Sequence, residues 1–110
     1  MANTKAEFNA IRSLAFGSIS GTYANVGTAL TDPAAAFRVA NNTDGDLLVS
    51  LDGGVTDHLF VAAGNFVLYD IRANKRNKNQ DDYVIPAQTQ FAVKQVTAPT
   101  EGNIYIEVLK

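Results

Sequence analysis

A single histidine, His58, limits the catalytic chemistry that this chain of 110 residues could support. A serine hydrolase would use His58 as its base, with Ser50 as nucleophile and Asp52 or Asp57 to orient the imidazole. Proximity in sequence is the sole support for that site, and we favour the simpler interpretation of a histidine beside a turn. Because the chain has no cysteine, thiol nucleophiles, thiolate metal sites and disulfides are excluded. We expect a protein that is not an enzyme and needs no cofactor.

Four aspartates lie close together with no lysine or arginine among them: Asp44, Asp46, Asp52 and Asp57. Carboxylate oxygens are the ligands that calcium prefers, but their spacing does not match an EF-hand loop. Aspartate is also favoured in turns, because its side chain accepts hydrogen bonds from the nearby backbone. We favour turn chemistry and expect no metal site.

Four of the nine basic residues fall within seven positions: Arg72, Lys75, Arg76 and Lys78. This stretch can be solvated, with its charge balanced by neighbouring aspartates, or it can bind an acidic patch on a protein partner. Phosphate binding would use the same charge. However, the stretch has no aromatic residue to stack on bases, and the net charge of the chain is −2. A solvated loop and a protein contact both remain open, and we expect no binding to nucleic acid.

The elements that must position these residues are β-strands. Apolar residues alternate along residues 37–39 and 47–51, on either side of Asp44-Gly45, and this pattern predicts a hairpin with a two-residue turn. The preceding Asn41-Asn42-Thr43 matches a glycosylation acceptor, but we interpret it as the approach to that turn. A second hairpin is predicted from residues 58–62 to residues 65–71.

The remaining alternating segments bring the total to seven or eight short strands, with a turn every 8 to 12 residues or so. This pattern predicts an all-β fold, an antiparallel β-sandwich or jelly roll, with one domain over residues 16–110. It does not distinguish a jelly roll from an immunoglobulin-like sandwich. No apolar run is long enough for a transmembrane helix, so we expect no membrane partner.

Residues 1–15 are predicted to form a short helix or an extended arm. Thr4 and Glu7 match a capping box, and apolar residues follow at three-residue spacing: Phe8, Ile11 and Leu14. So short a helix is marginal alone. The segment must pack on its own sheet or reach a second subunit.

The strings VANNTDGDLLVSLDGG, FVAAGNFVLYDI, VIPAQTQFAVK and IYIEVLK resemble small structural proteins of tailed-bacteriophage virions. The resemblance covers roughly residues 14–110 and consists of strand and turn patterns without a catalytic motif. It implies a non-enzymatic β-sandwich that decorates or cements a capsid by binding neighbouring shell subunits. It also implies a dimer or trimer, located in virions that assemble in the host cytoplasm.

We therefore expect the major capsid protein or other virion subunits as partners. The contact residues that we expect lie in the arm and in the basic stretch: Phe8, Ile11, Leu14, Arg72, Lys75, Arg76 and Lys78. A head–tail connector or tail component is the first alternative, and copy number per particle distinguishes it. A carbohydrate- or calcium-dependent binding module is the second, and ligand-dependent stabilisation distinguishes that one.

Overall fold

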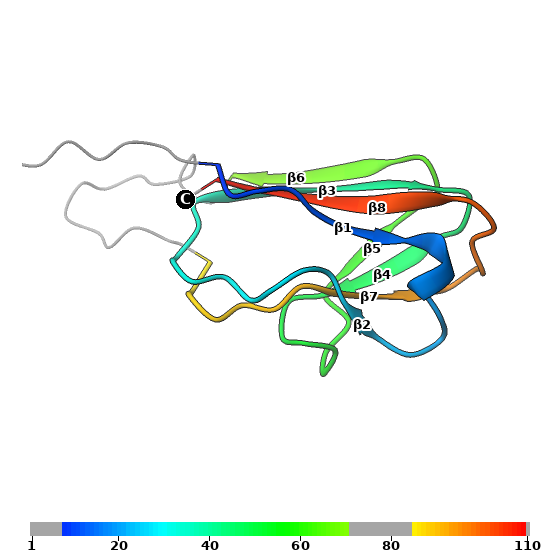
Figure 1. Cartoon of the computed structure of the whole chain (residues 1–110), viewed down its shortest axis with the longest axis horizontal. Coiled ribbons are helices and arrows are strands. Elements are labelled where there is room, and N and C mark those ends of the chain that lie inside the picture. Colours follow the sequence, from blue (N-terminus) through cyan, green and yellow to red (C-terminus); the bar gives the residue numbers. More distant parts are fainter. Residues whose placement is uncertain (1–7, 71–84, 110) are drawn as a thin grey trace, which may run out of the picture.

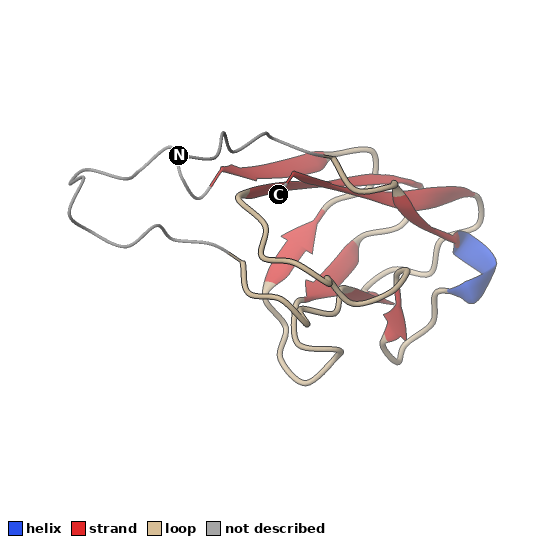
Figure 2. Ribbon diagram, turned by 60° about the vertical axis from the view of Figure 1, so that its left-hand side comes forward, coloured by secondary structure: helices blue, strands red, loops and turns tan. Residues whose placement is uncertain are grey.

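The computed structural model describes residues 8–70 and 85–109. They form two antiparallel four-stranded sheets that pack face to face (Figure 1), so the predicted all-β sandwich is confirmed. Figure 2 shows the strands of both sheets in red and the short 3-10 turn in blue. The elements are β1 (Arg12–Ala15), η1 (Phe16–Ser18), β2 (Ala24–Asn25), β3 (Ala36–Thr43), β4 (Leu47–Ser50), β5 (Leu59–Val61), β6 (Phe66–Asp70), β7 (Ala92–Gln95) and β8 (Gly102–Leu109).

The strand order is β1-β8-β3-β6 in the first sheet and β2-β7-β4-β5 in the second. Strands pair in a nested series, β1 with β8, β2 with β7, β3 with β6 and β4 with β5, always antiparallel. A long antiparallel ribbon rolled over on itself gives this order, which is that of an eight-stranded jelly roll. The topology therefore selects the jelly roll from the two sandwiches that the sequence left open.

Both predicted hairpins are wrong, because their strands belong to different sheets. β3 pairs with β6 and β8, whereas β4 pairs with β5 and β7. β5 and β6 are likewise divided between the sheets. Alternating apolar residues suit strands that face each other across a core as well as strands that lie side by side. The hairpin that does form between consecutive strands joins β4 to β5.

Gly45 explains how the chain crosses between the sheets after β3. Its φ is not positive, as the predicted hairpin turn would require. Instead, a Cβ at this position would lie 2.3 Å from the carbonyl oxygen of Thr97 and 2.9 Å from the nitrogen of Pro99. Glycine is needed here because the β3–β4 turn packs against the backbone of the β7–β8 loop.

The helix predicted near the N-terminus does not form over residues 8–15. Arg12–Ala15 is strand β1, which pairs with β8 in a register that places Leu14 opposite Ile104. Leu14 packs against the core from this strand, so burial in a sheet outweighs the marginal local preference for a helix. Residues 1–7 lie outside the described residues.

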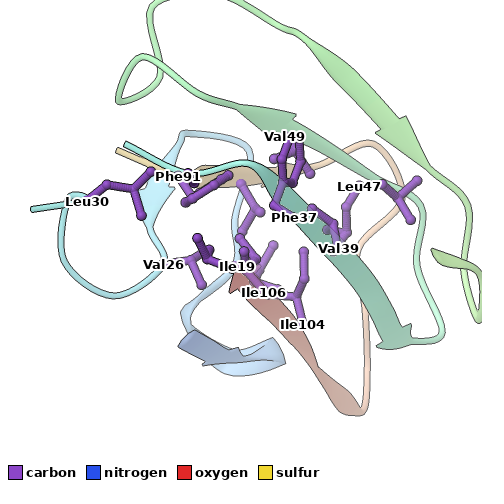
Figure 3. Close-up of a cluster of buried hydrophobic side chains, with 14 residues drawn as sticks. Ile19, Val26, Leu30, Phe37, Val39, Leu47, Val49, Phe91, Ile104 and Ile106 are labelled. Atoms are coloured by element: carbon purple, nitrogen blue, oxygen red, sulfur yellow. The ribbon is translucent and has the colours of Figure 1, made fainter. Parts of the chain in front are cut away.

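The core fills the space between the two sheets (Figure 3). Phe91 is fully buried, and its ring centroid lies 5.5 Å from that of Phe37. Phe37 also stacks on Tyr69, at 5.4 Å between centroids. Inward side chains of β3, β4 and β8 complete the cluster, namely Val39, Leu47, Val49, Ile104, Ile106 and Val108. This rigid core fixes which side chains of the first sheet point outward.

Candidate functional site

The outer surface of the first sheet carries several large apolar side chains that are exposed to water. Leu109 of β8 pairs with Ala36 of β3, and Leu68 of β6 pairs with Arg38 of β3. All four side chains lie on the side of the sheet that faces away from the core. Phe8 joins them through an isolated bridge to Leu109. We call this surface the apolar face and define it by the side chains Phe8, Ala36, Phe66, Leu68 and Leu109.

Three members of the apolar face are large and well exposed. Phe8 is 77% exposed, Leu68 62% and Phe66 57%. Single exposed apolar residues are normal, but a contiguous group of them marks a contact surface. Phe8 and Leu68 border a shallow hollow of about 330 Å³, whose lining also includes Leu109 and the charged side chains of Arg38, Asp70 and Glu107. Phe66 lies outside this hollow.

An ion pair occupies the middle of the apolar face. Arg38 and Glu107 lie opposite each other on β3 and β8, and Nη1 of Arg38 donates to Oε1 of Glu107 at 2.6 Å. The Arg38 guanidinium carbon also lies 4.7 Å from the centre of the Phe66 ring. The pair is partly exposed, so it adds little stability. Its fixed geometry gives the face one cation and one anion that a partner could match.

The predicted partner-binding residues fall into three groups. Phe8 lies on the apolar face, and Ile11 is 62% exposed just before β1. Leu14 is half-buried against the core, so the structure does not place it with the other two. Arg72, Lys75, Arg76 and Lys78 lie outside the described residues. The predicted role of these residues in partner binding stays a prediction.

Ser50, His58 and Asp52 do not form a hydrolase relay in this structure. The Ser50 hydroxyl donates to Oδ1 of Asp52 at 2.5 Å. Nδ1 of His58 accepts the backbone N–H of Leu51 at 3.0 Å. Nucleophile and base must share a hydrogen bond to act together. The hydrogen bonds of Ser50 and His58 instead stabilise the β4–β5 loop.

Asp52 is the centre of that loop. Its Oδ1 also accepts the backbone N–H groups of Val55 and Thr56, at 3.1 and 3.0 Å. The hydrogen bond from Ser50, followed by that from Thr56, holds the pKa of Asp52 well below its usual range. The favoured interpretation of Asp52 as a turn residue therefore matches its contacts.

A second polar cluster joins the same loop to β7. Tyr23 donates its hydroxyl to Oδ1 of Asp57, and Nζ of Lys94 lies 3.5 Å from that oxygen. Lys94 also lies over the Tyr23 ring, 5.0 Å from its centre. Burial, and then the hydrogen bond to Asp57, raise the pKa of Tyr23, so the phenol remains a donor near neutral pH. The hydrogen bond from Tyr23 in turn lowers the pKa of Asp57.

Asp44 and Asp46 also accept hydrogen bonds from backbone N–H groups. Asp44 accepts the hydroxyl and the backbone N–H of Thr100, and Asp46 accepts the backbone N–H of Ala63 at 2.9 Å. In residues 8–70 and 85–109, no group of three or more histidine, cysteine or acidic side chains is placed to hold a metal ion.

Stability should fall in acid because of these aspartates. The Thr100 hydroxyl is the largest cause that lowers the pKa of Asp44 below its ordinary value of 3.8, and Asp52 and Asp57 are lowered as well. A lowered folded-state pKa stabilises the fold above the unfolded-state pKa, and this contribution is lost as pH falls through the folded value. Asp44→Asn should melt at a lower temperature than the wild type at neutral pH. Its melting temperature should then fall less between neutral pH and about pH 2.5.

Thermal melts followed by circular dichroism at both pH values measure this difference. Glu101→Gln is the matched control, because it removes one carboxylate charge next to Thr100 and leaves the hydrogen bonds of Asp44 in place. Equal acid sensitivity of Asp44→Asn and the wild type would contradict the assignment.

The side chain of Asn41, a residue that no sequence pattern singled out as functional, takes part in four hydrogen bonds within residues 8–70 and 85–109. It is fully buried, and its Nδ2 donates to the carbonyl oxygens of Gly45 and Val61 at 2.9 and 3.0 Å. Its Oδ1 accepts the backbone N–H and the hydroxyl of Thr43, at 3.0 and 2.6 Å. Asn41 thereby joins β3, the β3–β4 turn and β5, and thus links the two sheets.

Comparisons with known proteins give no relative. No family model matches the chain, and no curated protein and no solved structure is similar enough to it to be reported. The part of the chain that the structure describes contains no helix of the length and apolarity needed to cross a bilayer.

Proposed function

We propose that this chain is a non-enzymatic structural protein of a tailed-bacteriophage virion, which decorates or cements the capsid by binding neighbouring shell subunits. The apolar face of the first sheet is the observation that supports this proposal most strongly. The strand and turn strings of residues 14–110 resemble small virion proteins, and this resemblance is the reason for proposing a tailed-phage virion as the particle.

The chemistry of the apolar face suits a protein surface better than a small ligand. The face is broad and shallow, and its large members Phe8, Phe66 and Leu68 are more than half exposed. Small-molecule sites are concave and enclose most of their ligand, whereas protein interfaces have an apolar centre with a few matched charges. A shell subunit with an apolar patch and a facing charge pair would match the face and Arg38–Glu107.

The architecture is compatible with a virion role without requiring it. Jelly rolls occur in viral capsid proteins and also in lectins and cupins, so the fold does not specify the function. A weak contact is sufficient for a cement protein if each copy bridges two subunits, because the second contact then forms at high effective concentration. A rigid sandwich also suits this role, since little conformational entropy is lost in ordering it on binding.

Co-sedimentation tests the proposal. The purified chain is mixed with empty shells of the phage whose genome encodes it, and bound copies per shell are counted by quantitative mass spectrometry. We expect saturable binding at hundreds of copies per shell, because a cement protein occupies every equivalent junction of a symmetric shell.

Two other outcomes would each contradict the cement role. Saturation at a few copies per particle would identify a head–tail connector or tail component. Absence of binding, together with a melting temperature that rises with added calcium or glycan, would identify a binding module instead.

A further inference from the structure

Strand β6 is the least protected edge among those that the structure describes. Within residues 8–70 and 85–109 both sheets are open, so β1, β6, β2 and β5 each have one side on which no described strand lies (Figure 1). β6 has five residues, whereas β1 has four, β5 has three and β2 has two. Proteins usually protect an edge with lysine, proline or a bulge. FVLYD contains neither lysine nor proline, and the bulge at Gly64 and Asn65 lies before the strand rather than within it.

The hydrogen bonds of β6 with β3 show which backbone groups point toward the open side. Gly64 and Asn65 together oppose Asn41 in a bulge, because the N–H of Gly64 donates to the carbonyl oxygen of Asn41 at 2.9 Å and the N–H of Asn41 donates to the carbonyl oxygen of Asn65 at 2.8 Å. Along an antiparallel strand, residues alternate between bonding to this neighbour and pointing away from it. Val67 and Tyr69 therefore bond to β3, whereas Phe66 and Leu68 direct their N–H and C=O groups to the open edge.

We propose that β6 pairs in antiparallel fashion with β6 of a second copy of this chain, across a two-fold axis at Leu68. This register makes Leu68 of each copy a hydrogen-bonded pair with Leu68 of the other, so that both side chains lie on the apolar face. Phe66 of each copy then lies opposite Asp70 of the other. Because one surface patch serves both copies, the contact closes as a dimer.

The charges near the edge fit this register. The Arg38 guanidinium covers the Phe66 ring, so Asp70 of the second copy arrives beside a cation. In the joined sheet, Arg38 on β3 and Asp70 on β6 of the second copy would be separated by β6 of the first copy, so this attraction would act across the Phe66 ring. A parallel pairing of the two strands would instead place the two Asp70 carboxylates together.

The dimer extends beyond the proposed function, because it needs no shell to form. It joins two four-stranded sheets into one sheet of eight strands and makes the apolar faces of both copies continuous. The dimer and shell binding can therefore fail independently, since Phe8 lies on the apolar face but not on β6.

Light scattering and amide hydrogen exchange on the full chain test the dimer. The weight-average mass should rise with concentration from 11.8 kDa toward twice that value. Over the same range, the amides of Phe66 and Leu68 should become protected. The amides of Val67 and Tyr69 serve as an internal control, because they are bonded to β3 and should be protected at every concentration.

Leu68→Lys should weaken the dimer by at least about 10-fold, because the pairing would bring two lysines together on the two-fold axis. Val55→Lys is the matched control, since Val55 is 85% exposed in the β4–β5 loop and should leave the dimer unchanged. Thermal melts show whether each variant is folded. A monomer at all concentrations up to about 1 mM would overturn the proposal. A dimer in which Phe66 and Leu68 exchange freely would overturn it as well.

Discussion

Replacing Asn41 with alanine should lower the free energy of unfolding by about 3–5 kcal/mol, because several buried backbone groups lose their partner at once. The carbonyl oxygen of Val61 and the N–H of Thr43 each bond to the Asn41 side chain. A buried polar group left without a partner costs about 1–3 kcal/mol, and the vacated space adds a further cost. Since a domain of this size is stable by only about 5–15 kcal/mol, this one change should remove a large part of its stability.

Urea titration followed by circular dichroism measures the change. Asn42→Ala is the matched control, because Asn42 is the adjacent residue on β3 and its side chain is exposed. It should change the free energy of unfolding by less than about 0.5 kcal/mol. If Asn41→Ala unfolded at the same urea concentration as Asn42→Ala, the central role given to the Asn41 side chain would be wrong.

Replacing Gly102 with alanine should cost about 2–5 kcal/mol, since it combines backbone strain with a steric clash. Gly102 begins β8 with φ at +93°, a conformation that residues with a Cβ rarely adopt. A Cβ there would also lie 1.9 Å from the carbonyl oxygen of Asn42 on the paired strand. Relief requires β3 and β8 to separate at one end, where the two strands otherwise pair along their full length.

Differential scanning calorimetry checks this cost against Gly21→Ala. Gly21 is exposed, and a Cβ at its position would meet no atom within 4 Å, so its variant should melt within a few degrees of the wild type. Similar melting temperatures for the two variants would show that β8 can start in another conformation.

The alternating pattern predicted most of the strands but not their partners. The remaining alternating segments were expected to be strands, and they contain β7 (Ala92–Gln95) and β8 (Gly102–Leu109). Assignment to a sheet depends on contacts between distant parts of the chain, such as β3 with β8. No local pattern reports such contacts, so the Asp44-Gly45 turn was mistaken for a hairpin.

The apolar face could be predicted only in part. Phe8 was expected to contact a partner and does lie on the face. Phe66 and Leu68 were missed because residues 66–69, FVLY, are apolar or aromatic on both sides of the strand, so the pattern does not say which side is buried. The structure resolves this by pairing Val67 with the fully buried Val39. Asn41 was missed because its sequence context, Asn41-Asn42-Thr43, is also typical of an exposed turn.

If the apolar face binds the shell, Phe8→Lys should have a lower affinity for empty shells than the wild type. Phe8 is 77% exposed and pairs with Leu109 of β8, which β3 separates from β6, so this variant should fold and still form the dimer. The control is again Val55→Lys, which adds the same charge at an exposed aliphatic residue outside the apolar face. We predict that Phe8→Lys binds at least about 10-fold more weakly than the wild type, and that Val55→Lys binds equally well. Equal binding by Phe8→Lys and the wild type would contradict the claim.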